Sequence, residues 1–120
     1  MQSGYQKTSF LREQKTLMAY KARYSAIAEI DLFEVIGELS QFYQSTPKKF
    51  KTALKKALAN AKLNPYMYKT SPYNPDYRQF TIKDYIVLYK VIETSKNTGY
   101  IEVYRILYGS RNIEQILNSL

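Results

Sequence analysis

Residues 77–117 read YRQFTIKDYIVLYKVIETSKNTGYIEVYRILYGSRNIEQIL and carry most of the strand pattern of this chain. Val, Ile and Tyr are enriched, and apolar and polar residues alternate as they do in half-buried strands. Lys83-Asp84 predicts a tight turn, and TSKNTG at residues 94–99 predicts a hairpin loop. The three strands expected around these turns are residues 77–82, 85–93 and 100–108.

Helical spacing dominates the chain upstream of these strands. A first helix is expected after Ser25, a favoured N-cap residue, and a second from Thr46-Pro47 to about Leu63. A short alternation at residues 18–24 predicts a strand, and the apolar spacing after Gly109 predicts a short closing helix. The first helix is expected to turn its apolar residues inward: Ala28, Leu32, Val35, Ile36, Leu39, Phe42 and Tyr43. Its acidic residues are expected to face outward: Glu29, Asp31, Glu34 and Glu38. The second helix is expected to turn these residues inward: Phe50, Ala53, Leu54, Ala57, Leu58 and Ala61.

The element order β-α-α-β-β-β-α predicts an α+β fold, in which an antiparallel sheet packs against a helical hairpin and the first strand lies at an edge. The pattern is lost before Met18. Residues 1–17 are therefore expected to be an N-terminal extension, either non-native or a native arm, and residues 18–120 to form one domain.

The composition excludes several classes of protein. The 120 residues contain no Cys and no His, which removes thiol nucleophiles, disulfides, ordinary zinc sites and Ser-His-Asp triads. No metal or cofactor is expected, because the chain has no aspartate-rich calcium loop either. It also lacks a signal peptide and any apolar run of the roughly 18–20 residues that span a bilayer. We therefore expect a soluble cytoplasmic protein with no membrane partner.

The net charge of +8 is unevenly distributed. Residues 18–44 carry two basic and four acidic side chains, a net charge of −2, whereas residues 45–111 carry thirteen basic and four acidic ones, a net charge of +9. A polyanion is the natural partner of such a basic segment, because each neutralised phosphate releases counterions. The alternative is that the lysines of the second helix form its solvated face. Four of these lysines are candidate nucleic-acid contacts: Lys48, Lys49, Lys55 and Lys56.

Three arginines on or beside the predicted strands are the strongest candidates for phosphate contacts. Arg78 and Arg105 interrupt apolar strands, and Arg111 follows the last one. The planar guanidinium group matches phosphate, so the three could form a cradle, or Arg78 and Arg105 could pair across strands with Glu93 or Glu102. Tyr108, between Arg105 and Arg111, is a candidate acid/base or stacking group. Further candidate contacts to nucleic acid are Lys69 and Tyr77.

Motifs in both halves of the chain resemble those of the RelE/ParE toxins of type II toxin–antitoxin modules. Family members carry an Arg-containing strand, matched here by Arg78, then a K/D-Y-x-h-x-Y strand (h apolar), matched by residues 84–89. They end in an h-R-h-h-H-G-x-R-D-h pattern, which is similar to residues 104–113. The helix motif A-x-x-D-L-x-x-I is similar to residues 28–36, where Ala28, Asp31 and Leu32 match and Ile36 lies one residue beyond the motif's Ile position. KLNPYMY, at residues 62–68, resembles the usual L-x-x-N-P end of the second helix.

Two positions depart from the family pattern. Tyr108 stands where many members have His, and Asn112 where many have Asp. Histidine titrates near neutral pH, whereas tyrosine, with a reference pKa near 10, needs neighbouring cations to exchange a proton there. The substitution weakens a simple acid–base role without removing it.

The resemblance implies a growth-arresting toxin that a cognate antitoxin neutralises, with an acidic antitoxin segment over the basic face. RelE-like members cleave mRNA on the ribosome, and ParE-like members poison DNA gyrase. We expect a metal-independent, ribosome-dependent mRNA endoribonuclease that acts through the 2′-hydroxyl, with a gyrase poison or a non-catalytic binding module as alternatives. For cleavage, Arg78 and Arg105 are expected to stabilise the phosphate, with Arg111 as support, Lys69 as a further cation and Tyr108 as the acid/base group.

Overall fold

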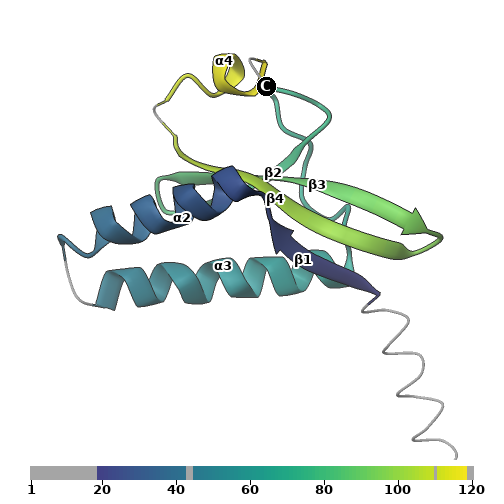
Figure 1. Cartoon of the computed structure of the whole chain (residues 1–120), viewed down its shortest axis with the longest axis horizontal. Coiled ribbons are helices and arrows are strands. Elements are labelled where there is room, and N and C mark those ends of the chain that lie inside the picture. The colour runs from purple at the N-terminus through teal and green to yellow at the C-terminus, as the bar shows by residue number, and fades with distance from the viewer. Residues whose placement is uncertain (1–18, 43–44, 110, 119–120) are drawn as a thin grey trace, which may run out of the picture.

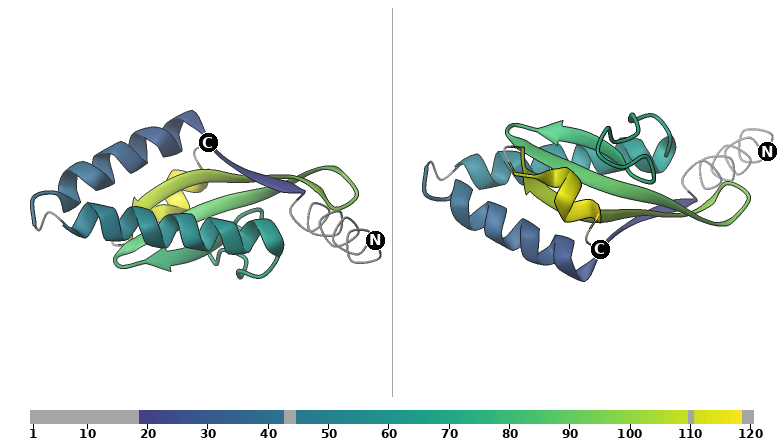
Figure 2. Two further views of the ribbon diagram at one scale, coloured as in Figure 1. Left: turned by 90° about the horizontal axis from the view of Figure 1, so that it is seen from below. Right: turned by 90° about the horizontal axis from the view of Figure 1, so that it is seen from above.

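A four-stranded sheet, in the order β1-β4-β3-β2, forms the middle layer of this protein. The structure is a computed structural model that describes residues 19–42, 45–109 and 111–118. Two helices cover one face of the sheet, and the short last helix lies on the other (Figures 1 and 2). The elements in chain order are β1 (Tyr20–Tyr24), α2 (Ala26–Leu39), α3 (Ser45–Leu63), β2 (Arg78–Ile82), β3 (Tyr85–Ser95), β4 (Thr98–Tyr108) and α4 (Ile113–Asn118).

The predicted α+β fold and its element order are confirmed. β2, β3 and β4 form the antiparallel meander, and β1 lies at the edge, as expected. β1 runs parallel to β4, from Tyr20 opposite Gly99 to Tyr24 opposite Val103. The parallel pairing is possible because the two helices that follow β1 carry the chain across the sheet before β2 begins.

Side chains of the helical hairpin and the sheet form the main core. The Ser25 hydroxyl caps α2 by accepting a hydrogen bond from the backbone N–H of Ala28 at 3.0 Å, and it donates to the carbonyl of Tyr104 at 2.8 Å. The cap therefore also fastens the start of α2 to β4. The inward residues expected for α3 are confirmed, since they are buried or half-buried: Phe50, Ala53, Leu54, Ala57, Leu58 and Ala61.

The helix boundaries and two inward–outward assignments differ from the prediction. α2 ends at Leu39, so Phe42 lies beyond it and is 71% exposed, and Tyr43 is outside the described residues. α3 begins at Ser45, which places Thr46 inside the helix instead of at its cap. Asp31, expected to face solvent, is buried with an exposed fraction of 7%.

The β3–β4 hairpin is longer than predicted. Both strands extend into the expected loop at residues 94–99, where Ser95 pairs with Thr98 and leaves Lys96 and Asn97 as a two-residue turn. Asn97 adopts a φ of 61°, which asparagine tolerates better than most residues. The short turn accounts for the extra strand pairs.

A β-bulge in β4 sets the directions of the side chains around Arg105. Val103 pairs with Tyr89 and Arg105 with Leu88, so Tyr104 is an additional residue on β4. Val103 belongs to the core under the helical hairpin, whereas Tyr104 packs on the opposite face, against the cluster that includes α4. Beyond the bulge, Arg105 lies opposite Leu88 of β3, and its guanidinium bonds to Asp31 of α2.

Gly99 is the position where the backbone tolerates a side chain least. Its φ is +158°, and a Cβ atom placed there would lie 1.9 Å from the carbonyl oxygen of Ile92. We expect Gly99→Ala to destabilise the protein by at least about 2 kcal/mol, because β3 or the β1 edge must move. Gly37→Ala is the matched control, since a Cβ atom there would meet nothing within 4 Å. This substitution replaces a glycine inside a helix and should not destabilise the protein. Thermal unfolding measures both, and a Gly99→Ala protein as stable as the wild type would contradict the prediction.

Candidate functional site

Arg105 forms an ion pair with Asp31 that joins β4 to α2. Arg105 Nε lies 2.8 Å and Nη2 3.1 Å from the two carboxylate oxygens of Asp31, and the backbone N–H of Ile106 donates to the same carboxylate at 2.9 Å. The two side chains are 15% and 8% exposed. The guanidinium is thus held in a bidentate, mostly buried pair, whose partner comes from the helix.

The two carboxylates considered as cross-strand partners have other contacts. Glu102 pairs with Arg23 at 3.1 Å, at the exposed edge of the sheet. Glu93 accepts a hydrogen bond from the hydroxyl of Tyr66. The alternative that Arg105 pairs with Glu93 or Glu102 is therefore wrong for Arg105.

Arg78 holds the loop that follows α3. Its Nη1 donates to the carbonyl of Tyr68 at 2.7 Å and to that of Tyr66 at 3.3 Å. The guanidinium carbon also lies 5.0 Å from the centre of the Tyr66 ring. These contacts satisfy loop carbonyls with a charged donor and stabilise the connection between α3 and β2.

The sheet register separates Arg78 from the end of β4. Arg78 and Arg105 flank β3, opposite Tyr89 and Leu88 respectively. Tyr108 lies opposite Tyr85, four residues along β3 from Tyr89, which corresponds to roughly 13 Å of strand. The four candidate catalytic residues therefore do not meet at a single point.

Tyr108 and Arg111 do lie together, in a recess that the prediction did not describe. The backbone N–H of Arg111 donates to the carbonyl of Tyr108 at 3.0 Å, and the Tyr108 side chain is 43% exposed. Its ring meets that of Tyr85 edge-on at 5.5 Å, and the Tyr85 hydroxyl donates to Glu38 at 2.9 Å. Residues from α2, β3 and the end of β4 line this cavity of about 20 Å³: Asp31, Glu34, Val35, Glu38, Tyr85, Ile106, Tyr108 and Arg111.

Of the candidate nucleic-acid contacts, Tyr77 is a core residue. It is 5% exposed, its ring lies 5.0 Å from that of Tyr104, and Lys90 Nζ lies 4.6 Å from the ring centre. A base cannot stack on this ring without unpacking the α4 side of the sheet. Lys69 is exposed on the loop before β2, next to the strand that Arg78 begins.

The four candidate lysines of α3 are exposed, but they lie apart from the arginines. Lys48, Lys49, Lys55 and Lys56 occupy the solvent side of α3, while Phe50 and Leu54 face the sheet. They form a basic surface on the helical layer. Arg105 is beneath that layer, bonded to α2.

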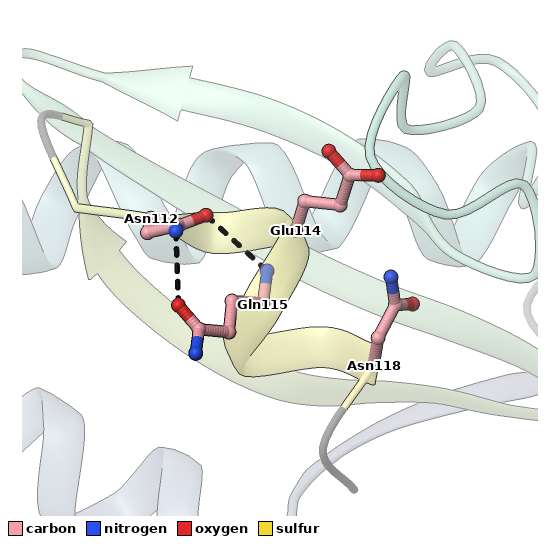
Figure 3. A pocket seen from close by; sticks show the side chains of 4 residues that line it. All are labelled: Asn112, Glu114, Gln115 and Asn118. Carbon is pink, nitrogen blue, oxygen red and sulfur yellow. Dashed lines mark hydrogen bonds between the residues drawn. The ribbon is translucent and has the colours of Figure 1, made fainter.

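Asn112 has a structural role at the start of α4. Its Oδ1 accepts the backbone N–H of Gln115 at 3.3 Å, and its Nδ2 donates to Gln115 Oε1 at 3.0 Å. An aspartate would cap the helix in the same way, so the substitution of Asn for the family's Asp preserves the cap. A cavity of about 490 Å³ lies beside α4, but Figure 3 shows Asn112 and Gln115 turned toward each other and Glu114 and Asn118 pointing elsewhere. These side chains do not converge on a ligand.

Sequence reasoning missed the importance of Asp31. Its position three residues after Ala28 and four before Val35 places it on the buried face of α2, and that spacing was visible in the sequence. A carboxylate on a buried face needs a charged partner, so the signal was available. No group of three acidic side chains in the described ranges is placed to hold a metal ion. None of the helices described here is both long and apolar enough to cross a membrane.

Removing either partner of the buried ion pair should strongly destabilise the fold. We expect Asp31→Ala to lower the free energy of unfolding by about 3–5 kcal/mol, because it leaves the Arg105 charge buried and unpaired. Arg23→Ala is the control, since it breaks the exposed pair with Glu102 and should cost less than about 1 kcal/mol. Urea unfolding compares the two variants, and equal losses of stability would contradict the assignment.

Four tyrosines should make the protein sensitive to alkaline pH. The hydrogen bond to Glu93 raises the pKa of Tyr66 to about 12, and burial raises the pKa values of Tyr77, Tyr85 and Tyr89 to about 12, from the ordinary tyrosine value of about 10. The unfolded chain loses these protons first, so their contribution to stability is complete below pH 10 and is lost between about pH 10 and 12. Urea midpoints across this range measure the effect, and Tyr66→Phe should reduce the slope. A constant midpoint from pH 10 to 12 would be inconsistent with these pKa values.

Comparison with known proteins identifies the family. The family model described as the ParE toxin of the type II toxin–antitoxin system parDE matches residues 22–113. A solved structure of the chromosomal ParDE TA system from P. aeruginosa is similar, with a TM-score of 0.52 and 14% identity over 76% of this chain and 97% of that chain. A mutant of the E. coli toxin RelE in complex with a peptide of the antitoxin RelBc has a TM-score of 0.46 and 19% identity, over 86% of this chain and 96% of that chain. No curated protein sequence matches significantly. Because the family model covers most of the chain, the chain belongs to the ParE toxin family of type II toxin–antitoxin systems.

Proposed function

We propose that this toxin arrests growth by binding DNA gyrase through protein contacts. The observation that carries the proposal is that Arg78 and Arg105, the two arginines on the strands, are already bonded to other groups of the protein. Arg105 is bonded to Asp31, and Arg78 is bonded to the carbonyls of the loop after α3. A phosphate-stabilising centre needs cations that point at a common position, and these two guanidinium groups instead bond to groups within the fold. Membership of the ParE family supports the same target, because gyrase is the target of ParE-like members.

The proposed contact surface is the recess around Tyr108 and Arg111. Tyr108 is the exposed aromatic residue at the end of β4, and Arg111 is exposed beside it. Glu34 and Glu38, both exposed on α2, contribute negative charge to the same recess. Tyrosine and arginine are the residue types that dominate protein–protein binding energy, and the mixed charges suit a protein surface better than a phosphate backbone.

A metal-independent mRNA endoribonuclease is the second candidate. One observation favours it: the recess brings a phenol, a guanidinium and two carboxylates together. Glu34 or Glu38 could take the proton of a 2′-hydroxyl, Arg111 could contact the phosphate, and Tyr108 could supply a proton to the leaving oxygen. In this reaction Arg78 and Arg105 would stabilise the fold around the site, with Lys69 as an additional cation outside the recess.

We also propose that a cognate antitoxin covers the basic part of the toxin. The exposed lysines of α3, including Lys48, Lys49, Lys55 and Lys56, offer a positively charged helix surface to an acidic segment. Complementary charge would accelerate association and orient the segment. The site of action that follows from either target, gyrase or the translating ribosome, is the cytoplasm.

Two assays on the same variants separate the two functions. The full-length toxin should inhibit supercoiling by purified gyrase, and Arg111→Ala should weaken the inhibition by roughly tenfold or more. Tyr108→Phe keeps the ring and removes the hydroxyl, so it should retain most of the inhibition. Lys96→Ala, at the tip of the β3–β4 hairpin, is the control and should behave as the wild type. Primer extension on mRNA after toxin induction should show no new cuts.

The opposite pattern would favour RNA cleavage. New cuts at fixed codon positions, lost by about a hundredfold or more in Tyr108→Phe, together with undisturbed supercoiling, would overturn the gyrase proposal. A folded toxin that affects neither gyrase nor mRNA would overturn both candidates.

A further inference from the structure

The outward side of α2 carries an apolar seam that has no partner in the described part of the chain. The seam consists of Ala26, Ile30, Phe33 and Gly37, at spacings of four, three and four residues, which place all four on one line along the helix. Ile30 is 59% exposed and Phe33 82% exposed. The opposite side of α2 packs on the sheet through Ala28 and Val35. α2 therefore has two apolar faces, and only the face toward the sheet is packed within the described part of the chain.

Gly37 is the unusual member of this seam. A glycine inside a helix costs up to about 1 kcal/mol relative to alanine. A Cβ at Gly37 would meet nothing within 4 Å, so no contact inside the chain requires a glycine there. A small residue on an outward helix face allows another helix to approach closely. The seam therefore has the residue pattern of a helix-packing surface, with the large residues Ile30 and Phe33 in the middle and the small residues Ala26 and Gly37 at its ends.

The neighbouring helix α3 carries a complementary surface. Thr52 and Ala59 are exposed, small residues on the outward side of α3. Exposed lysines surround them, including Lys48, Lys55 and Lys56. The outward seam of α2 is flanked by acidic side chains instead, with Glu29 on one side and Glu34 on the other, both exposed. Figure 2 shows α2 and α3 side by side in one layer over the sheet, so both surfaces belong to the same face of the molecule.

We propose that this face binds a second copy of the toxin in a two-fold symmetric dimer. The seam of α2 in each copy packs on the Thr52–Ala59 surface of α3 in the other, so that Phe33 and Ile30 fill the space above the small residues. Glu29 and Glu34 then face the partner's lysines. The alternative two-fold arrangement places α2 on α2, which would bring the acidic flanks together and is disfavoured by like-charge repulsion.

The charge pattern selects a second copy over other occupants. An acidic peptide would suit α3 but not the acidic flanks of α2, and a basic helix would suit only α2. A second copy satisfies both surfaces at once, because the face carries both halves of the pairing. The proposal is independent of the gyrase proposal, since it concerns the outward side of the helical hairpin and not the recess at Tyr108 and Arg111. It shares the α3 lysines with the proposed antitoxin contact, so the dimer is a form of the toxin without its antitoxin.

Sedimentation analysis of the full-length toxin, made by cell-free synthesis to avoid toxicity, tests the dimer. We expect a monomer–dimer equilibrium within concentrations up to roughly 100 μM. Phe33→Glu should raise the dissociation constant by roughly tenfold or more. It should leave the unfolding temperature of the monomer, measured at low concentration, unchanged, because Phe33 is 82% exposed in a single copy. Met67→Glu, at an exposed apolar position in the loop after α3, is the control and should leave the dissociation constant within about twofold.

Two further variants separate docking from fold stability. Gly37→Gln should raise the unfolding temperature of the monomer, because it removes a helix glycine, and should weaken the dimer by blocking close approach. Glu29→Lys and Lys55→Glu should each weaken the dimer, and the double variant should recover part of the loss. A monomer over the whole concentration range, a dimer that Phe33→Glu leaves intact, or open-ended assembly in place of a dimer would each overturn the proposal.

Discussion

The bidentate pair between Asp31 and Arg105 connects the two layers of this toxin. It joins the buried face of α2 to the bulge in β4, and the same carboxylate accepts the N–H of Ile106. Both ions are taken out of water, so each depends on the other for solvation. The bulge at Tyr104 lies next to Arg105, and the Ser25 hydroxyl bonds the start of α2 to the carbonyl of Tyr104. The position of the helical hairpin on the sheet follows from these contacts.

This pair also changes the functional meaning of the charged residues. Arg105 and Arg78 look like phosphate ligands in the sequence, but one neutralises a buried acid and the other satisfies loop carbonyls. Of the candidate site residues, Tyr108 and Arg111 are exposed at one end of the sheet, Lys69 is exposed on the loop before β2, and the lysines of α3 are exposed on the helical layer. This dispersion of the cations is the basis for the proposal of a protein target, because stabilising one phosphate needs charges aimed at a common point.

Much of the architecture could be predicted because it depends on local patterns. Alternation along residues 77–108 and helical spacing from Ala28 to Leu63 both report burial directly. The errors arose where a single residue departs from its pattern. Asp31 is polar but buried, because it pairs with a residue 74 positions away. Phe42 is apolar but exposed, because α2 ends at Leu39. Tyr77 was predicted from the sequence to contact nucleic acid, yet its ring is part of the core beneath α4.

Length, charge distribution and hydrophobic periodicity were enough to predict an α+β domain with a basic second half, because these properties are carried by neighbouring residues. The candidate site was not accessible in the same way. Strand register and the β4 bulge determine which of Arg78, Arg105, Tyr108 and Arg111 meet, and both depend on pairings between distant segments. If a strand shifted by one residue against its neighbour, its side chains would point to the opposite faces of the sheet. Only the folded chain could therefore show that Tyr108 and Arg111 share a recess, while Arg105 is buried against Asp31.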